Sequence, residues 1–239
     1  MKIMTWNTAL TEGSDATAVI NYVKEFLDKE DDTIAVLQQI PYKLPDESLD
    51  ADEKWENAIE HPSYTQFDKT FPKDKYTVSK NTTFNNGRIV MLTAIVTRMK
   101  CVKDEIFATT NREAAIQIKD SYSVFGVHAK TGNDTKSYLI GLNSINADII
   151  LGDFNAGDYY RYKDEPCENR ATFKSILKDY VCICNMPTKE VKNKNGELIR
   201  RTCIDHVFVK SSIVDKCSSL KIHEDIKISD HYPITFYIE

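Results

Sequence analysis

The sequence has no long apolar run. No segment approaches the roughly 18 consecutive apolar residues that a membrane-spanning helix needs. Residues 1–7 contain one lysine and no apolar stretch, so they do not resemble a secretory signal. No low-complexity tract or internal repeat is visible. These absences predict a soluble, cytoplasmic protein with no membrane partner.

Cysteine spacings typical of metal or disulfide sites are also missing. None of the cysteines form Cys-x-x-Cys, the spacing of zinc sites, and six in 239 residues are too few for a disulfide scaffold. Cys182 and Cys184 alternate with apolar residues, as on one face of a strand. We interpret the cysteines as buried free thiols. They are Cys101, Cys167, Cys182, Cys184, Cys203 and Cys217.

The chain carries no overall excess of basic charge. Its net charge is −5 and its pI is near 5.6, which argues against a protein that coats nucleic acid through bulk electrostatics. The segment 189–201 is a local exception, because five lysines and arginines stand there against two glutamates. This segment ends just before Asp205 and indicates a basic rim beside a candidate site. A solvated hairpin tip is the open alternative.

The composition is that of an ordinary globular protein, with 41% apolar and 28% charged residues. At 239 residues we expect one domain, spanning 1–239.

The hydrophobic periodicity predicts many strands and few helices. Apolar residues spaced by three and four predict an amphipathic helix from Ser14 to Lys29. A capping-box spacing predicts a second helix from Asp50 to His61 with Ile59 facing inward, followed by a loop over residues 62–75. Asn195-Gly196 predicts a hairpin turn. Strands are expected at 2–6, 33–37, 88–98, 114–119, 122–128, 148–151, 204–209, 220–222 and 234–238, and short helices at about 137–144 and 170–178. The pattern indicates an α/β (α+β) protein, with two packed sheets and helices outside.

Polar side chains suited to phosphate-ester chemistry lie at the ends of these strands or interrupt them. Cleaving a phosphodiester requires metal ligands, a group that activates water and a group near the leaving oxygen. The residues are Asn7, Gln39, His128, Asp153, Asn155, Asp205, Asp230 and His231.

Each of these residues alone has an ordinary structural explanation. A strand-terminal Asn or Asp is often a turn former, and His128 is compatible with a hydrogen-bonded core histidine. Asp205 is harder to explain, because an unpaired carboxylate inside an apolar run is costly. We predict that it pairs with a histidine. The joint pattern is what indicates a site.

In chain order these segments resemble the motifs of the endonuclease/exonuclease/phosphatase superfamily, which includes deoxyribonuclease I, repair exonucleases, sphingomyelinases and inositol polyphosphate 5-phosphatases. The most specific match is Gly152-Asp153-Phe154-Asn155. The other matches are Thr5-Trp6-Asn7, Leu37-Gln38-Gln39, Val127-His128, Ile204-Asp205-His206-Val207-Phe208 and Ser229-Asp230-His231-Tyr232-Pro233. The resemblance implies a four-layer α/β/β/α sandwich like that of deoxyribonuclease I, with two mainly antiparallel sheets face to face and the site at one edge.

The resemblance also implies catalytic roles. His231 would be the catalytic histidine beside the scissile phosphate, oriented by Asp205. Asp153 would activate or orient the attacking water, and Asn155 would hold a phosphoryl oxygen. His128 would assist the phosphate or the leaving group.

The metal site departs from the superfamily pattern at Gln39. The resemblance places Asn7, Gln39 and Asp230 at a site for Mg²⁺ or Mn²⁺, which prefer oxygen ligands, but the superfamily has a glutamate at the position of Gln39. The amide is nearly isosteric and neutral, so we expect weaker metal binding and slower turnover. Two explanations are open: an engineered inactivating change in an otherwise intact enzyme, or natural decay to a binding protein. We favour the first because every other motif is present.

The motifs do not identify the substrate, because branches that cut DNA, RNA, lipids and inositol phosphates share them. Tyr159 and Arg161 lie in a run of tyrosines and cations that suits stacked bases and phosphates, with a packed surface loop as the alternative. Arg200 and Arg201 belong to the basic segment and complete the predicted substrate-binding residues.

We therefore expect a divalent-metal-dependent nuclease that hydrolyses DNA or RNA without an obligate protein partner. The sequence lacks an apolar anchor for lipid and a dense lysine and arginine pocket for inositol phosphates. Two alternatives are a phosphoesterase acting on a small phosphorylated molecule or nucleotide, and a non-catalytic relative that binds nucleic acid.

Overall fold

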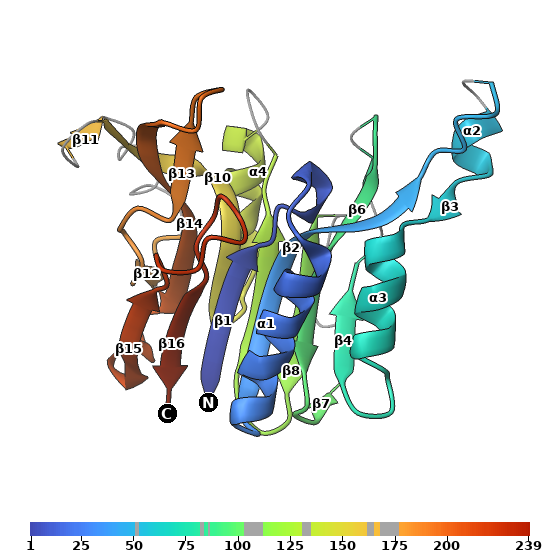
Figure 1. Cartoon of the computed structure of the whole chain (residues 1–239). Coiled ribbons are helices and arrows are strands. Elements are labelled where there is room, and N and C mark those ends of the chain that lie inside the picture. Colours follow the sequence, from blue (N-terminus) through green and yellow to red (C-terminus); the bar gives the residue numbers. More distant parts are fainter. Residues whose placement is uncertain are drawn as a thin grey trace.

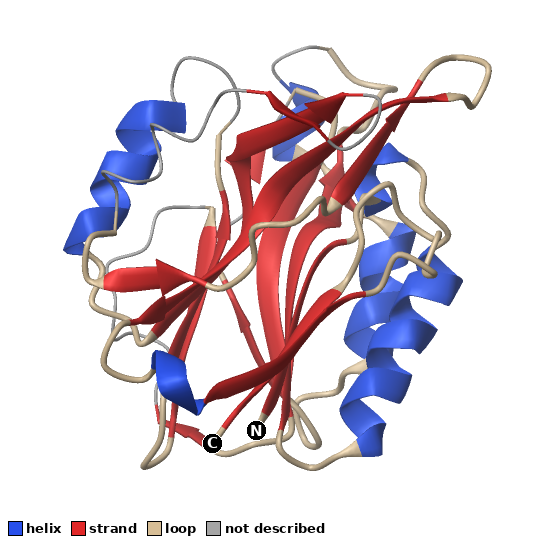
Figure 2. Cartoon of the chain, turned by 90° about the vertical axis from the view of Figure 1, so that its left-hand side faces the viewer, coloured by secondary structure: helices blue, strands red, loops and turns tan. Residues whose placement is uncertain are grey.

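The chain forms two β-sheets that pack face to face, with helices on the outside, as the computed structural model shows (Figure 1 and Figure 2). The structure describes residues 1–50, 53–81, 84–85, 87–102, 112–130, 135–161, 165–167 and 177–239. At 84–85, 135–136, 158–161 and 165–167 it describes the backbone only. The predicted four-layer α/β/β/α sandwich is confirmed.

The first sheet combines the N-terminal and C-terminal parts of the chain. It comprises β1 (Lys2–Asn7), β2 (Thr33–Leu44), β3 (Ile59–Glu60), β4 (Thr77–Lys80), β5 (Phe84–Asn85), β6 (Val90–Thr97), β15 (Cys217–Ile222) and β16 (Ile234–Ile238). The order is β15-β16-β1-β2-β6-β4, with β3 paired to β2 and β5 to β6. β1 and β2 are parallel, whereas β1 and β16 are antiparallel, so the two chain ends lie side by side (Figure 1).

The second sheet is formed by the middle of the chain. It comprises β7 (Cys101–Val102), β8 (Glu113–Ile118), β9 (Ser123–His128), β10 (Ile149–Arg161), β11 (Glu165–Cys167), β12 (Tyr180–Cys182), β13 (Lys189–Lys192) and β14 (Leu198–Lys210). The order is β12-β14-β10-β9-β8-β7, with β11 paired to β10 and β13 to β14. β9 and β10 are parallel and their other neighbours are antiparallel. The predicted hairpin at Asn195-Gly196 joins β13 to β14.

Helices cover the outer faces of both sheets (Figure 2). The α-helices are α1 (Ala16–Lys29), α2 (Glu53–Glu56), α3 (Pro62–Thr70) and α4 (Thr135–Gly141), and the 3-10 helices include η1 (Leu10–Glu12), η3 (Leu142–Ser144) and η4 (Val214–Lys216). The predicted helix α1 begins after Asp15, whose side chain accepts hydrogen bonds from two backbone amides. Within the described residues, no helix has the length and apolar character needed to span a membrane.

Alternating side chains divide the core into three apolar layers. Along β1, Ile3 points into the layer between the two sheets, and Met4 packs against the helices on the first sheet. A third layer joins the second sheet to α4, where Leu139 packs with Phe125 and Phe154. The strands therefore bury both faces, which explains their long apolar runs.

The predicted helix over residues 50–61 is wrong for most of its length. Among the described residues of this segment, only Glu53–Glu56 forms a helical turn. Ile59 is 56% exposed within β3, which pairs with the end of β2. Tertiary pairing overrides the local helical signal there. The predicted loop over 62–75 instead contains α3, which is capped by the side chain of His61 and has Pro62 at its first position. The helix predicted at 170–178 falls mainly outside the described residues.

Candidate active site

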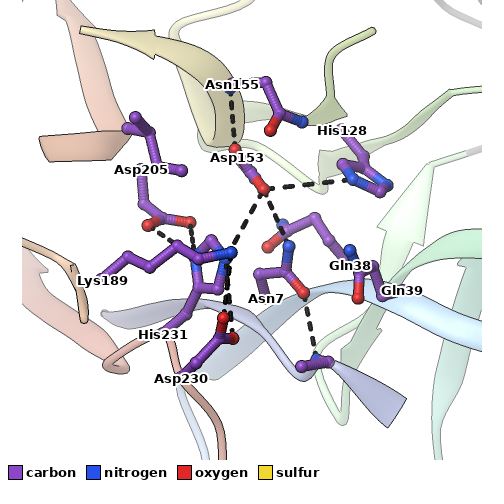
Figure 3. A network of polar contacts seen from close by, with 12 residues as sticks. Asn7, Gln38, Gln39, His128, Asp153, Asn155, Lys189, Asp205, Asp230 and His231 are labelled. Carbon is purple, nitrogen blue, oxygen red and sulfur yellow. Dashed lines mark hydrogen bonds and ion pairs between the residues drawn. The ribbon is translucent and has the colours of Figure 1, made fainter. Parts of the chain in front are cut away.

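Residues from both sheets meet at one edge of the sandwich (Figure 3). In the first sheet, Asn7 at the end of β1 is paired with Gln38 of the parallel strand β2. In the second sheet, His128 at the end of β9 is paired with Asp153 of the parallel strand β10. Open sheets place ligand sites beyond the carboxyl ends of parallel strands, and the same principle applies to both pairs. The predicted residues that meet here are Asn7, Gln39, His128, Asp153, Asn155, Asp205, Asp230 and His231.

The His231 imidazole is held by a buried carboxylate. Its Nδ1 lies 2.8 Å from Oδ2 of Asp205, and the two side chains are 1% and 4% exposed. The Thr188 hydroxyl donates to the same Oδ2 at 2.6 Å. Burial lowers the pKa of His231, but Asp205 and, more weakly, Asp153 outweigh burial and raise the pKa above its ordinary value. The pair therefore favours an imidazolium with Nε2 toward Asp153.

Asp153 lies between the two sheets at the centre of this cluster. Its Oδ2 accepts a hydrogen bond from Nδ2 of Asn7 at 2.8 Å and lies 3.9 Å from Nε2 of His231. Burial, followed by the charge of Asp205, raises the pKa of Asp153 to about 6, although His231 and two hydrogen bonds lower it. A carboxylate with raised basicity can accept a proton from water near neutral pH.

The segment Gly152-Asp153-Phe154-Asn155 has a backbone shape that fixes this carboxylate. Gly152 has a φ of 139°, and a Cβ at this position would lie 2.1 Å from the backbone oxygen of Val127. Asn155 has a φ of 47°, and its backbone amide donates to Oδ1 of Asp153 at 2.7 Å. Nδ2 of Asn155 donates to the backbone oxygen of Ala129 at 2.9 Å. The motif is thus a tight turn that locks Asp153 and presents the Asn155 side chain beside it.

His128 is a buried, neutral histidine. Its Nε2 lies 4.0 Å from Oδ2 of Asp153. Burial, followed by the positive charges of Arg112 and His231, lowers the pKa of His128 to about 3. At neutral pH this imidazole can donate a hydrogen bond, but it does not carry the extra proton of a general acid.

Gln39 is held by the short helix η1 that follows β1. Its Oε1 accepts from the Thr11 hydroxyl at 3.1 Å, and its Nε2 donates to Oε1 of Glu12 at 3.3 Å. The backbone of Gln39 has a φ of 58°, so a local irregularity of β2 turns this side chain toward η1. The neutral amide satisfies both partners, whereas a glutamate would bring a second negative charge next to Glu12.

The side chains at this edge are of the types that hold a divalent cation. Oε1 of Gln38 and Oδ1 of Asp230 are buried without a hydrogen-bond partner in the described part of the chain. Such oxygens are costly unless a cation or water faces them, and oxygen donors are the ligands that hard cations prefer. A second group of candidate ligand atoms belongs to Asp153, Asp205 and His231, within 4.8 Å of one another.

The structure separates the predicted substrate-binding residues. Arg200 lines a cavity of about 650 Å³ next to Asn155 and Asp230. Arg201, the next residue along β14, instead contacts the carboxylate of Glu224. Tyr159 and Arg161 lie in β10, but their side chains are outside the described part of the structure.

Two cavities flank the cluster around Asp153, and Asn155 lines both. The cavity on one side, of about 650 Å³, is lined by Lys189, Lys192 and Arg200 among others. The cavity on the other side, of about 700 Å³, is lined by Gln39, Arg112 and His128 among others. An extended substrate can therefore continue past the cluster in two directions.

Sequence reasoning missed two residues of the site. Thr188 orients Asp205, and Lys189 contacts Asp230 with its ammonium nitrogen 3.0 Å from Oδ2. Lys189 was counted only as part of the basic segment. The run Thr-Lys-Glu-Val-Lys indicates a strand, but its pairing with β14 is what brings both residues to the site.

Known structures share this fold over nearly their whole length. A 3'-5' exonuclease from Neisseria meningitidis, NExo, matches with a TM-score of 0.66 and 16% identity, covering 100% of both chains. The endonuclease domain of TRAS1, a telomere-specific non-LTR retrotransposon, matches with a TM-score of 0.66 and 16% identity, covering 100% of this chain and 98% of that one. An endonuclease/exonuclease/phosphatase family protein from Leptotrichia buccalis C-1013-b matches with a TM-score of 0.65 and 19% identity, covering 100% of this chain and 99% of that one.

The fold is that of the endonuclease/exonuclease/phosphatase superfamily. The fold that the motif resemblance implies is therefore confirmed over the whole chain. No protein-family model and no curated protein matches the sequence. Within this endonuclease/exonuclease/phosphatase fold, the cluster of Asp153, Asp205 and His231 lies at the edge where the motifs of both sheets converge.

Proposed function

We propose that this chain is a divalent-metal-dependent phosphodiesterase that hydrolyses nucleic acid. The observation that carries the proposal is the buried arrangement of Asp205, His231 and Asp153. A carboxylate bonded to Nδ1 of a histidine, with a second carboxylate 3.9 Å from Nε2, places a cationic donor and a base on opposite sides of one small space.

In the proposed reaction, water attacks the phosphorus atom, the bond to the leaving oxygen breaks, and that oxygen takes up a proton from solvent. Asp153 accepts a proton from the water, and its raised pKa makes it a stronger base than an ordinary carboxylate. His231, kept cationic by Asp205, donates a hydrogen bond to a phosphoryl oxygen. Asn155 offers its amide from the neighbouring turn, and neutral His128 donates a hydrogen bond on the side of the leaving oxygen.

Mg²⁺ or Mn²⁺ would be held by Asp230, Gln39 and Asn7 at the edge of this cluster. A bound divalent cation would neutralise charge on the phosphate. The glutamine supplies a neutral oxygen there, so the affinity for the cation would be lower than with glutamate.

Two observations favour nucleic acid over a small phosphate ester. Cavities on both sides of the cluster leave room for a polymer beyond the scissile bond. Lysines and Arg200 line the cavity of about 650 Å³, which suits a phosphate backbone. NExo, which shares the fold, is named as an exonuclease and as a 3' phosphatase, and a variant of it has been solved with a product DNA hairpin.

A parallel assay tests the proposal. The wild-type chain and the Gln39→Glu variant are incubated with Mg²⁺ or Mn²⁺ and single-stranded DNA, duplex DNA, RNA or small phosphate esters. We expect cleavage of at least one polymer. Hydrolysis confined to small esters would support the alternative phosphoesterase, and salt-dependent binding without cleavage by either chain would support a nucleic-acid-binding protein.

A matched pair of histidine variants controls for contaminating nucleases. His231→Ala should abolish cleavage while leaving the melting temperature within a few degrees of the parent. His223→Ala should retain cleavage, because His223 hydrogen-bonds Thr235 outside the cluster. Equal activity of both variants would assign the cleavage to another protein.

A further inference from the structure

Lys189 places a positive charge inside the site that the superfamily motifs do not account for. Its ammonium nitrogen lies 3.0 Å from Oδ2 of Asp230, one of the residues assigned to the metal. The Lys189 side chain is 22% exposed and lines the cavity of about 650 Å³. Figure 3 shows it directed from β13 toward the cluster around Asp153.

The backbone on both sides of Lys189 is fixed to the segment that carries the catalytic histidine. The amide of Tyr232 donates to the backbone oxygen of Thr188 at 2.7 Å, and the amide of Glu190 donates to that of Asp230 at 2.9 Å. The backbones of Lys189 and His231 also form an isolated antiparallel β-bridge. These contacts fix the backbone of Lys189 beside His231, so the lysine side chain begins at a defined position next to the site.

The ammonium belongs to a chain of charged groups that ends at Asp153. Oδ1 of Asp230 lies 3.9 Å from Nε2 of His231, and that nitrogen lies 3.9 Å from Oδ2 of Asp153. A lysine side chain, with an ordinary pKa of about 10.4, is a cation at neutral pH.

Two residues make this edge less negative than a glutamate at position 39 and an unpaired Asp230 would. Gln39 removes a negative charge from the metal site, and Lys189 occupies one oxygen of Asp230 with a positive charge. Both differences weaken the attraction for a divalent cation and strengthen the attraction for a phosphate. A lysine ammonium has three donors, and Asp230 takes one in the described structure, so donors remain for phosphoryl oxygens.

We propose that Lys189 binds the substrate phosphate and supplies part of the charge neutralisation that a divalent cation would otherwise provide. This proposal rests on the function proposed above and identifies a further residue of that site. A compact ammonium on a flexible stem is suited to this task, since it acts on phosphate as a point charge. By pairing with Asp230, Lys189 also competes with the cation for that carboxylate.

Two titrations of the full chain test the proposal without requiring turnover. Inorganic phosphate is titrated in the presence of a chelator, and Mn²⁺ is titrated separately, into the wild type and Lys189→Met. We expect the variant to bind phosphate about tenfold more weakly and Mn²⁺ about tenfold more tightly, because removing a nearby charge changes the two affinities in opposite directions. A purely structural role would weaken both.

Lys194→Met is the matched control, because Lys194 is exposed at the tip of the same hairpin and is not among the residues that line either cavity. It should leave both affinities within about threefold of the wild type. Lys189→Arg keeps the charge and should retain phosphate binding, which covers the case that Lys189→Met fails to fold. Equal phosphate affinity in the wild type and Lys189→Met, or weaker binding of Mn²⁺ by Lys189→Met, would overturn the proposal.

The two proposals fail in different ways. If phosphate binding depends on Lys189 but no phosphoester is cleaved by the wild type or Gln39→Glu, the phosphate site stands and the enzymatic function falls. If cleavage is observed and Lys189→Met changes neither kcat nor KM, the function stands and Lys189 has no part in it.

Discussion

The imidazole of His231 and the carboxylate of Asp205 are joined by a 2.8 Å contact between Nδ1 and Oδ2, and both side chains are buried. Asp205 lies in β14 of the second sheet, and His231 lies three residues before β16 of the first sheet. Because Asp205 stabilises the imidazolium, the charge of His231 depends on how the two sheets pack against each other.

Replacing Asp205 with Asn should lower kcat much more than it changes KM. The amide no longer stabilises the imidazolium, so we expect a loss of about 10³–10⁴-fold in kcat by analogy with other carboxylate–histidine pairs. Steady-state kinetics on the cleaved polymer measure the effect, and circular dichroism checks the fold. A loss below tenfold in a folded variant would show that His231 does not depend on this carboxylate.

Replacing Gln39 with Glu should increase both Mn²⁺ affinity and metal-dependent turnover. The added negative charge attracts the cation, although repulsion from Glu12 limits the gain. We expect an increase of about tenfold or more in affinity by calorimetry. Gln66→Glu, which adds the same charge on the outer helix α3, serves as the position control. An unchanged cleavage rate would rule out the interpretation of Gln39 as an inactivating change in an intact enzyme.

Replacing Arg200 with Ala should raise KM for a polymer substrate more than it lowers kcat. Arg200 lines the first cavity, and loss of a phosphate contact weakens binding in the ground state and the transition state alike. We expect a change of about three- to tenfold in KM at low salt. Arg201→Ala is the control, since Arg201 contacts Glu224. Identical kinetics for the two variants would remove Arg200 from the substrate path.

Replacing Gly152 with Ala should destabilise the fold by about 3 kcal/mol or more, because the new methyl group would meet the Val127 carbonyl and the backbone has a positive φ. Gly196 also has a positive φ, but a Cβ there would meet no neighbouring atom. We therefore expect Gly196→Ala to destabilise the fold by only about 1 kcal/mol. Urea denaturation of the two variants compares them. Equal losses would show that the backbone conformation alone decides the cost.

Replacing Glu190 with Gln should lower stability at neutral pH and have less effect in acid. Burial raises the pKa of Glu190, but the Tyr232 hydroxyl, Lys227 and Lys192 outweigh it and lower the pKa to about 2. A carboxyl with a depressed folded-state pKa contributes its stability above the unfolded pKa and loses it as pH falls through the folded pKa.

With allowance for solvent screening, the expected difference in unfolding free energy at pH 7 is about 1–2 kcal/mol. It should shrink as the pH falls from about 4.5 towards 2. Denaturation of both proteins across this pH range provides the test. A difference independent of pH would mean that Glu190 acts through shape and not through its charge.

The strand ends were the part of the site that the sequence could predict. Apolar runs ending in Asn7, His128 and Asp153 place polar groups at a sheet edge, and the cost of burying Asp205 alone predicted its contact with a histidine. The register between β13 and β14 was not predictable, because nothing local specifies that pairing. Lys189 therefore looked like one cation among several.

Helix α3 was missed for a different reason. Its N-terminal cap is the imidazole of His61, which accepts from the backbone amide of Ser63, and histidine is not among the preferred capping residues. The capping-box spacing upstream was a genuine local signal, but Ile59 and Glu60 gain more by extending the sheet next to Lys43 and Leu44. Long-range strand pairing therefore determines the structure of residues 59–60.

The pairing of β1 with β16 also has a consequence for biosynthesis. The strands of the second sheet lie in the sequence between strands of the first sheet. One edge of β1 therefore stays unpaired until β16 has been synthesised. Chains fold from the N-terminus as they leave the ribosome, and His231 is among the last described residues to emerge. A chain synthesised only as far as β14 therefore lacks His231 and has no complete cluster of Asp153, Asp205 and His231.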